Sequence, residues 1–167
     1  MIRARRLLWT SLLLLMVMSH MLGGQTVPPN EQPDRVGFPV NYAGNLEQVR
    51  HAYLPGRDKI ITVFVNALAA KVTALEQVPY PAGSAVVVEW ADPRKTEKGD
   101  VIRDEAGRVA KGLVTRVDVM RREPGYGAQY GADRAGEWEF ASFQADGRAM
   151  TLPDGAVACA RCHRRDR

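Results

Sequence analysis

Two thiols and an imidazole stand within five residues near the C-terminus. Cys159 and Cys162 are the two cysteines of the 167-residue chain, and His163 follows the second of them. Thiols at this spacing can each add across a vinyl group of haem, and the adjacent imidazole is then an axial ligand of the iron. The motif therefore predicts one haem c, held covalently through Cys159 and Cys162, with His163 as the iron ligand.

The same cysteine spacing also occurs in zinc sites and in thiol redox centres. A structural zinc takes four nitrogen or sulfur ligands, and outside the motif the only histidines are His51 and His20. A redox dithiol is expected at the strand-to-helix turn of a βαβ unit, whereas this motif lies close to the C-terminus. Haem is therefore the preferred interpretation, and a metal-binding or redox dithiol is the alternative.

The first residues have the composition of a secretory signal. Arg3, Arg5 and Arg6 precede an apolar run from Leu7 to Leu22. We therefore expect residues 1–24 to be a signal peptide and the protein to be periplasmic. The run is short for a membrane span, which takes about 20 apolar residues. If the leader is not cleaved, it would instead serve as an N-terminal membrane anchor.

Most of the positive charge belongs to that leader. The net charge of the chain is +4, and residues 1–24 contain three arginines and no acid, so 4 − 3 leaves +1 for the remainder. Nucleic acid is therefore not an expected partner. The C-terminal tail stays basic through Arg164, Arg165 and Arg167. These side chains could pair with haem propionates or attract an acidic redox partner, or they form a solvated terminus.

Residues 25–37 are rich in proline and predict an extended tether, and residues 38–167 have the length of one domain. Within that domain, β-branched and alternating apolar patterns predict strands at residues 60–65, 84–90, 113–121 and 137–144. We expect short helices at 44–53 and 67–77, a hairpin turn at 104–107, a loop at 124–136 and a helical turn at the motif. The sequence thus predicts an α+β domain dominated by an antiparallel β-sheet, with a few short helices and a C-terminal haem c motif.

Two other haem c architectures fit the chain less well. In the common small c-type cytochromes the motif lies near the N-terminus and a methionine ligand follows far downstream, but here only Arg164 to Arg167 follow His163. A four-helix bundle also ends in such a motif. The valine-rich strands and the content of 15 glycines and 10 prolines argue against a bundle.

The order of these segments resembles the cytochrome P460 family. It comprises the leader, the strand 62–66, the turn and strand from Tyr80 to Glu89, the segment 136–140 and the terminal motif. The resemblance spans most of residues 38–163. It implies an antiparallel β fold with a mostly five-coordinate haem c, which either oxidises hydroxylamine and nitric oxide or binds such gases. Dimers are common in that family, so a homodimer is a candidate assembly.

The resemblance also assigns positions around the haem. A lysine that is cross-linked to the haem in the family would fall at Val88, and a family arginine would fall near Ile61. Neither side chain here can form the cross-link or carry a charge, which predicts an apolar distal side that also includes Val86. Such a pocket is similar to that of the non-cross-linked cytochromes c′-beta, whose haem is capped by phenylalanines. Candidates for the cap, or for core packing, are Phe64, Phe140 and Phe143.

Few side chains can serve as a sixth iron ligand or as a catalytic base. Outside the leader, the methionine and histidine candidates are Met120, Met150 and His51, the last expected on a helix and at the surface. Strand alternation points Glu89 away from Val88. This leaves Asp118 as the candidate catalytic base for hydroxylamine or peroxide chemistry, with a solvent-facing carboxylate as the alternative.

The sequence therefore predicts a periplasmic mono-haem c cytochrome with an open distal site. Its expected ligand is nitric oxide or a related small nitrogen species, which it would bind or detoxify, with a redox protein as a candidate partner. The alternatives are a low-spin electron-transfer cytochrome c and a haem enzyme that oxidises hydroxylamine.

Overall fold

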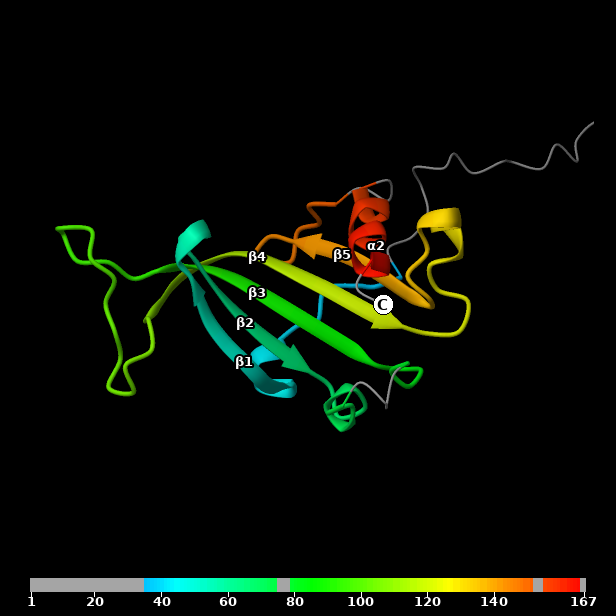
Figure 1. The fold of residues 1–167 in the computed structure, drawn as a ribbon, viewed down its shortest axis with the longest axis horizontal. Helices are drawn as coiled ribbons and strands as arrows, with labels where there is room; N and C mark the ends of the chain where they lie inside the picture. The colour runs from blue at the N-terminus through cyan, green and yellow to red at the C-terminus, as the bar shows by residue number, and fades with distance from the viewer. Residues whose placement is uncertain (1–34, 75–78, 152–154, 166–167) are drawn as a thin grey trace, which may run out of the picture. The chain divides into compact units, whose positions relative to one another are not determined.

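Five antiparallel strands form one sheet in which each strand pairs with the next along the chain (Figure 1). The computed structural model describes residues 35–74, 79–151 and 155–165, all within the unit Pro33–Arg167. The strands are β1 (Glu47–Leu54), β2 (Lys59–Val65), β3 (Ala85–Pro93), β4 (Lys111–Arg122) and β5 (Trp138–Phe143). The helices are α1 (Tyr42–Asn45) and α2 (Ala156–Arg165), with 3-10 turns η3 (Pro55–Arg57), η4 (Ala69–Lys71) and η6 (Ala128–Asp133). The predicted α+β fold dominated by an antiparallel sheet is confirmed.

The expected signal peptide at 1–24 and most of the expected tether lie outside the described residues. Within the part of the chain that the structure describes, no helix has the length and apolarity needed to cross a membrane.

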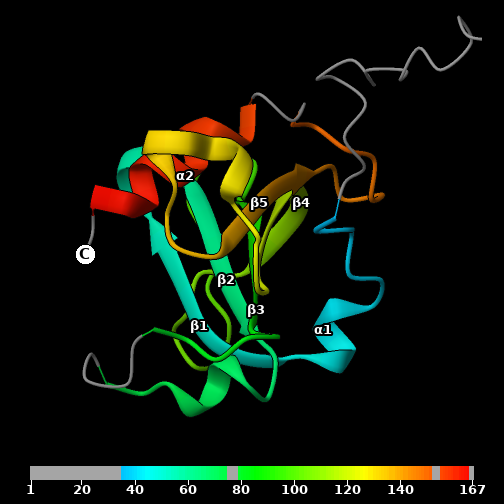
Figure 2. The same cartoon turned by 90° about the vertical axis from the view of Figure 1, so that its right-hand side faces the viewer.

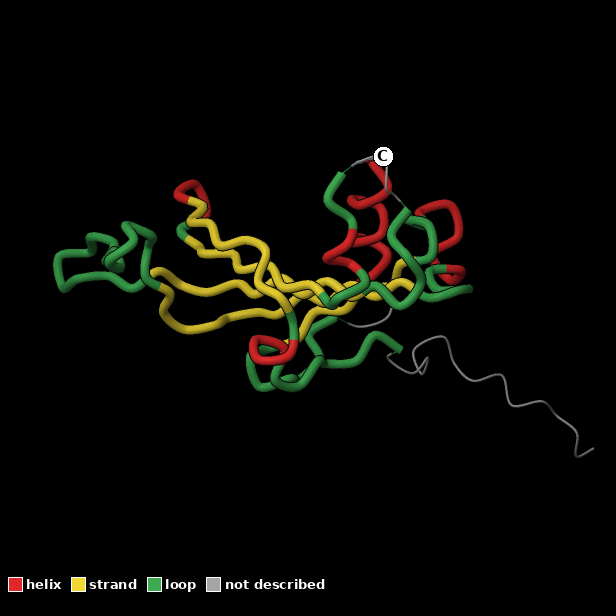
Figure 3. The backbone as a smooth tube through the Cα atoms, turned by 90° about the horizontal axis from the view of Figure 1, so that it is seen from below, coloured by secondary structure: helices red, strands yellow, loops and turns green. Residues whose placement is uncertain are grey.

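One face of the sheet, the core face, holds the main hydrophobic core. Its strand residues are Phe64, Val87, Val117, Val119 and Phe143, each at most 3% exposed. The segment 36–46 crosses this face and packs Val36, Phe38, Tyr42 and Leu46 against it (Figure 3). Alternating valines and aromatic residues suit this arrangement, because every second side chain of a strand points to the same side.

The opposite face, the helix face, carries α2. This helix packs against β5 and η6 (Figures 1 and 2). A second cluster of buried residues forms beneath it from Tyr130, Ala135, Phe140, Ala156 and Ala160. Across β2 and β3 on the same face, Ile61, Val63, Val86 and Val88 are only half-buried. Apolar side chains thus lie on both faces of the central strands, but those on the helix face are less buried.

Two predicted helices are wrong. Instead of a helix over 44–53, α1 ends at Asn45 and β1 begins at Glu47. Pairing with β2 from Glu47 to Leu54 satisfies the backbone along the strand, and this long-range pairing overrides the helical spacing of Leu46 and Val49. Instead of a helix over 67–77, only η4 forms, with the Ala69 N–H bonded to the side chain of Asn66 at 3.0 Å. Residues 75–77 of that prediction lie outside the described residues.

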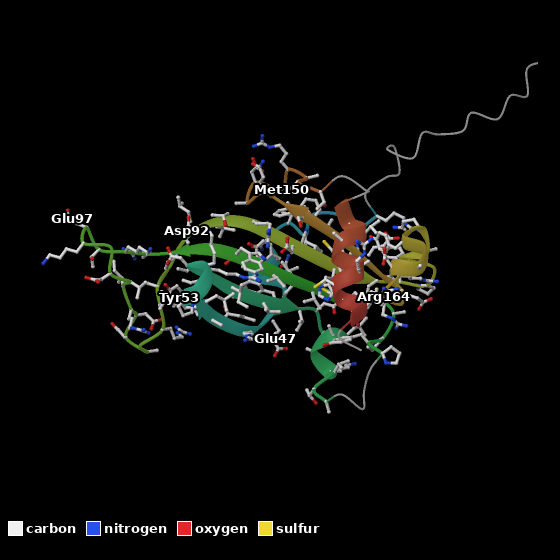
Figure 4. All side chains as sticks on the ribbon, turned by 45° about the horizontal axis from the view of Figure 1, so that its top comes forward. Glu47, Tyr53, Asp92, Glu97, Met150 and Arg164 are labelled. Carbon is white, nitrogen blue, oxygen red and sulfur yellow. The ribbon has the colours of Figure 1, made fainter. Side chains whose placement is uncertain are left out.

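The remaining predicted elements are confirmed with shifted ends. The hairpin turn lies in an arm, residues 94–110, that extends beyond the sheet, with Glu97 near its tip (Figures 1 and 4). Asp104 Oδ1 accepts the N–H groups of Ala106 and Arg108, and Gly107 has a φ of 74°, a backbone conformation that favours glycine. The loop at 124–136 contains η6, and the expected C-terminal turn is a ten-residue helix.

Candidate functional site

Helix α2 carries the cysteine–histidine motif on the helix face of the sheet. Ala156 and Ala160 are 5% and 0% exposed, and these small side chains let the helix approach β5 closely. Cys159 is half-buried, whereas Cys162 and His163 are exposed. Because residues three and four positions apart are neighbours on a helix, both thiols and the imidazole lie on adjoining parts of its surface. The structure therefore brings the three predicted haem-binding residues together.

The C-terminal half of α2 is held by ion pairs to η6. Arg161 Nη2 lies 2.8 Å from Asp133 Oδ2, and Arg164 Nη2 lies 3.6 Å from Asp133 Oδ1. Arg164 also donates to the carbonyl of Ala132 (Figure 4). The guanidinium of Arg164, expected at haem propionates or at a redox partner, is thus engaged with η6. The side chains of Arg165 and Arg167 lie outside the described residues.

The imidazole of His163 stacks on the ring of Phe140. The two ring centroids are 5.0 Å apart and the ring planes differ by 19°. Phe140 is 6% exposed, and its backbone N–H donates to the hydroxyl of Tyr130 at 3.3 Å. The two other candidates, Phe64 and Phe143, lie in the hydrophobic core on the core face, which agrees with the core-packing alternative for both.

Strand register places the predicted site residues in adjacent rows on the helix face. One row holds Ile61, Trp90 and Arg116, and the next holds Val63, Val88, Asp118 and Ser142. A third row holds Val86, Met120 and Phe140. Ile61, Val88, Asp118 and Phe140 therefore share the face that carries the motif, and their contact with a haem remains a prediction.

The carboxylate of Asp118 is fully engaged with neighbouring side chains. The indole Nε1 of Trp90 donates to Oδ2 at 2.7 Å, and the hydroxyl of Ser142 donates to Oδ1 at 2.6 Å. Arg116 Nε also lies 3.1 Å from Oδ1. These three side chains hold the carboxylate in place on the helix face. The catalytic role of Asp118 stays a prediction.

Glu89 lies on the core face, as strand alternation predicts. It is 3% exposed and accepts from the hydroxyl of Tyr42 at 2.6 Å and from Lys111 Nζ at 2.7 Å. This pairing holds the amine of Lys111 away from the helix face. Lys111 is therefore not placed to form a bond with a group bound beside α2.

Charged side chains on β4 affect the pKa of the Cys159 thiol. Burial raises the pKa of the Cys159 thiol, and the negative charge of Asp118 raises it further, while the positive charge of Arg116 acts in the opposite direction. The thiol is therefore protonated at neutral pH. The Arg116–Asp118 pair thus lies within electrostatic reach of Cys159.

Of the three candidate sixth ligands, Met120 alone shares the helix face with the motif. It is half-buried beside Phe140. Met150 lies in the loop beyond β5 and is 49% exposed (Figure 4). His51 lies on β1, so its predicted place on a surface helix is wrong. Its Nδ1 is 3.2 Å from Thr62 Oγ1 and its Nε2 is 3.3 Å from the carbonyl of Val109, on the core-face side.

Sequence reasoning missed three polar members of the site, Trp90, Arg116 and Ser142. The signal was available, because Trp90 stands two residues after Val88 and Arg116 stands two residues before Asp118. In a strand, that separation places side chains on one face. Ser142 was not recoverable in this way, since its place beside Asp118 depends on the pairing of β5 with β4.

The site has the chemistry needed to hold a haem c. It combines two thiols, an imidazole and a half-buried apolar surface, and haem is a mostly apolar ring whose iron takes an axial protein ligand. A structural zinc would require four ligands. Throughout the described ranges, no group of three or more His, Cys, Asp or Glu side chains is arranged to hold a metal ion. The residues present therefore fit haem better than zinc.

Comparison with known proteins identifies a family. The family model for cytochrome P460 matches residues 39–167, which include all five strands, α2 and the cysteine–histidine motif. No curated protein matches the chain.

Proposed function

The chain belongs to the cytochrome P460 family, and from this membership we propose that it is an exported mono-haem c cytochrome that binds nitric oxide or a related small nitrogen species. The family identifies a haem c cytochrome. The covalent attachment, the open distal side and the ligand are our proposal, as is export through residues 1–24.

In this proposal the helix face holds the haem. Cys159 and Cys162 would supply the thioether sulfurs, and His163 would bind the iron. When bound, the haem would supply an iron that can take a small ligand. The chain's own part is to orient His163 through Phe140 and the Asp133 ion pairs, and to exclude water with valine and isoleucine side chains.

The proposal depends mainly on one observation. Apolar side chains on the helix face of the central strands are less buried than those on the core face. On the core face Val87 and Val117 are 0% exposed, whereas Val63 and Val88 on the helix face are half-buried, although all four stand in the same sheet. Completing the burial of each such side chain is worth roughly 1 kcal/mol. An apolar group attached to the neighbouring thiols would cover this surface and gain that free energy.

The apolar side chains that the haem would cover favour a neutral ligand. Ile61, Val86 and Val88 present no hydrogen-bond donor that could stabilise a developing anion. The nearest carboxylate in the rows, Asp118, is engaged with Trp90, Ser142 and Arg116. A neutral diatomic gas can enter such a site without losing solvation that the chain must replace. Hydroxylamine oxidation, which the family associates with a lysine at the position of Val88, is correspondingly less favoured.

A low-spin electron carrier is the second candidate function. It is favoured by Met120, because a thioether on the helix face is within the sheet region that a haem beside α2 would cover. A weak Met ligand would close the distal side and leave no position for a gas.

Absorption spectra of the purified exported protein test the proposal. Ferric and ferrous spectra are recorded before and after addition of nitric oxide. We expect a high-spin spectrum that changes on adding the gas. A low-spin spectrum that the gas does not change would contradict gas binding. In that case Met120→Leu should convert the spectrum to high spin, and Met150→Leu, at an exposed methionine, is the matched control.

A further inference from the structure

Two guanidinium groups lie on the ring of Trp90 at the border of the apolar surface. Arg116, directly opposite on β4, places its guanidinium carbon 4.6 Å from the ring centroid. Arg57, in η3, places its own guanidinium carbon 5.8 Å from the same centroid. The indole of Trp90 is fixed by its hydrogen bond to Asp118 at 2.7 Å. The ring therefore holds two cations at one edge of the helix face.

The Nε side of the Arg116 guanidinium lies next to a carboxylate. Its Nε is buried and lies 3.1 Å from Asp118 Oδ1, but the N–H is not directed at that oxygen and makes no hydrogen bond. Among the residues that the structure describes, its two Nη groups make no hydrogen bond, and the guanidinium of Arg57 makes neither a hydrogen bond nor an ion pair. The terminal N–H groups of a guanidinium form a fork that matches the two oxygens of a carboxylate. The geometry thus leaves such a fork without a hydrogen bond beside an apolar surface.

The position of this fork suits the polar edge of a haem. The row of Ile61, Trp90 and Arg116 lies directly beside the row that contains Val63 and Val88, two side chains of the half-buried apolar surface. Arg116 and Asp118 also act electrostatically on Cys159, which places them near the attachment point. A haem c is apolar except for its iron and its two propionate carboxylates. A ring lying over the valine rows needs a cation for those carboxylates at the border.

We propose that Arg116, assisted by Arg57, binds a propionate of the haem that the proposed function places on the helix face. This inference rests on the proposed function and adds to it the residue that orients the haem edge. Asp118, through its ion pair, and Trp90, through its ring, are then positioning residues for Arg116, and Ser142 holds Asp118. A cation next to the ring favours the ferrous state, because the ferric iron carries one more positive charge.

The test compares four arginine variants of the haem-loaded protein. Arg116→Gln and Arg57→Gln remove the proposed cations, and Arg108→Gln removes an arginine paired with Asp104 in the arm away from the sheet. The readouts are the low-frequency resonance Raman bending modes of the propionates and the reduction potential. Circular dichroism and haem content establish that each variant is folded and loaded. Arg116→Lys keeps the charge but not the fork.

We expect Arg116→Gln to shift a propionate mode and to lower the reduction potential. Arg57→Gln should give a smaller change in the same direction, and Arg108→Gln none. Arg116→Lys should restore the potential more fully than the propionate mode. If the propionate modes and the potential of Arg116→Gln match those of a haem-loaded wild type, this inference alone is overturned. A wild type without haem would overturn the proposed function itself, and this inference with it.

Discussion

The rings of His163 and Phe140 lie face to face, with centroids 5.0 Å apart. This contact joins α2, which presents the predicted iron ligand, to β5, the edge of the sheet. Phe140 also belongs to the buried cluster beneath α2 with Ala156 and Ala160. One phenylalanine therefore both anchors the helix and supports the imidazole, on the side of His163 that faces the sheet.

Removing this ring should destabilise the protein. Phe140→Ala deletes a side chain that is 6% exposed, and such substitutions cost about 3 kcal/mol or more through lost burial and the cavity left behind. Phe140→Leu keeps most of the volume and should cost roughly 1 kcal/mol. Urea denaturation measures both free energies of unfolding. If Phe140→Ala lies within about 0.5 kcal/mol of the wild type, the ring does not anchor α2.

The two thiols of the haem-free chain should react at different rates. Burial, aided by the charge of Asp118, raises the pKa of Cys159, and the reactive species is the thiolate. Cys162 is exposed and Cys159 half-buried. We expect iodoacetamide at about pH 8 to modify Cys162 first, as measured by peptide mass spectrometry at intervals.

Asp118→Asn provides the check on that electrostatic account. Removing the carboxylate charge should lower the pKa of Cys159 and increase its rate of modification, while Cys162 changes little. Equal rates for the two thiols in the wild-type chain would contradict the half-buried placement of Cys159.

Tyr42 should make the protein less stable in alkali. Burial, and then the hydrogen bond to Glu89, raise the pKa of its hydroxyl above the ordinary value of about 10. Above about pH 10 the unfolded chain therefore loses this proton while the folded chain keeps it, and the free energy of unfolding falls as pH rises. Denaturation between about pH 9 and pH 11 should show a shallower fall in Tyr42→Phe. Parallel curves for the two proteins would refute this contribution.

A hydrogen-bond donor at Val88 should retain bound nitric oxide for longer. Val88→Asn places an amide on the apolar surface beside the proposed ligand site. A hydrogen bond worth about 1 kcal/mol would slow dissociation roughly fivefold. Stopped-flow measurement of ligand loss gives the rate, and Val88→Ile, which adds no donor, is the control. Identical rates in Val88→Asn and Val88→Ile would mean that Val88 does not face the ligand.

The sheet was predictable because its strands carry their pattern locally. The β-branched run from Ile60 to Val65 and the valines from Val86 to Val88 favour strands whatever they pair with. The β1 strand was missed because none of its side chains is fully buried and only the pairing with β2 makes it a strand. Local spacing cannot report a partner that lies on another segment.

The cysteine–histidine motif could be recognised in the sequence for a similar reason, because Cys159, Cys162 and His163 stand in one short segment. The positions of the side chains around the motif were predictable only in part. Alternation along β3 correctly placed Glu89 and Val88 on opposite faces, whereas the position of Asp118 opposite Val88 depends on the pairing of β4 with β3. The contact of Phe140 with His163 depends on how α2 packs on β5, and the core-face location of Phe64 and Phe143 depends on which side the segment 36–46 covers.

The most direct measurement of the central claim is the mass of the C-terminal peptide of the purified exported chain, combined with its pyridine haemochrome spectrum. We expect one haem on the peptide that contains Cys159 and Cys162, with no free thiol. A peptide of unmodified mass with both thiols free, from a protein expressed with active haem attachment, would contradict it.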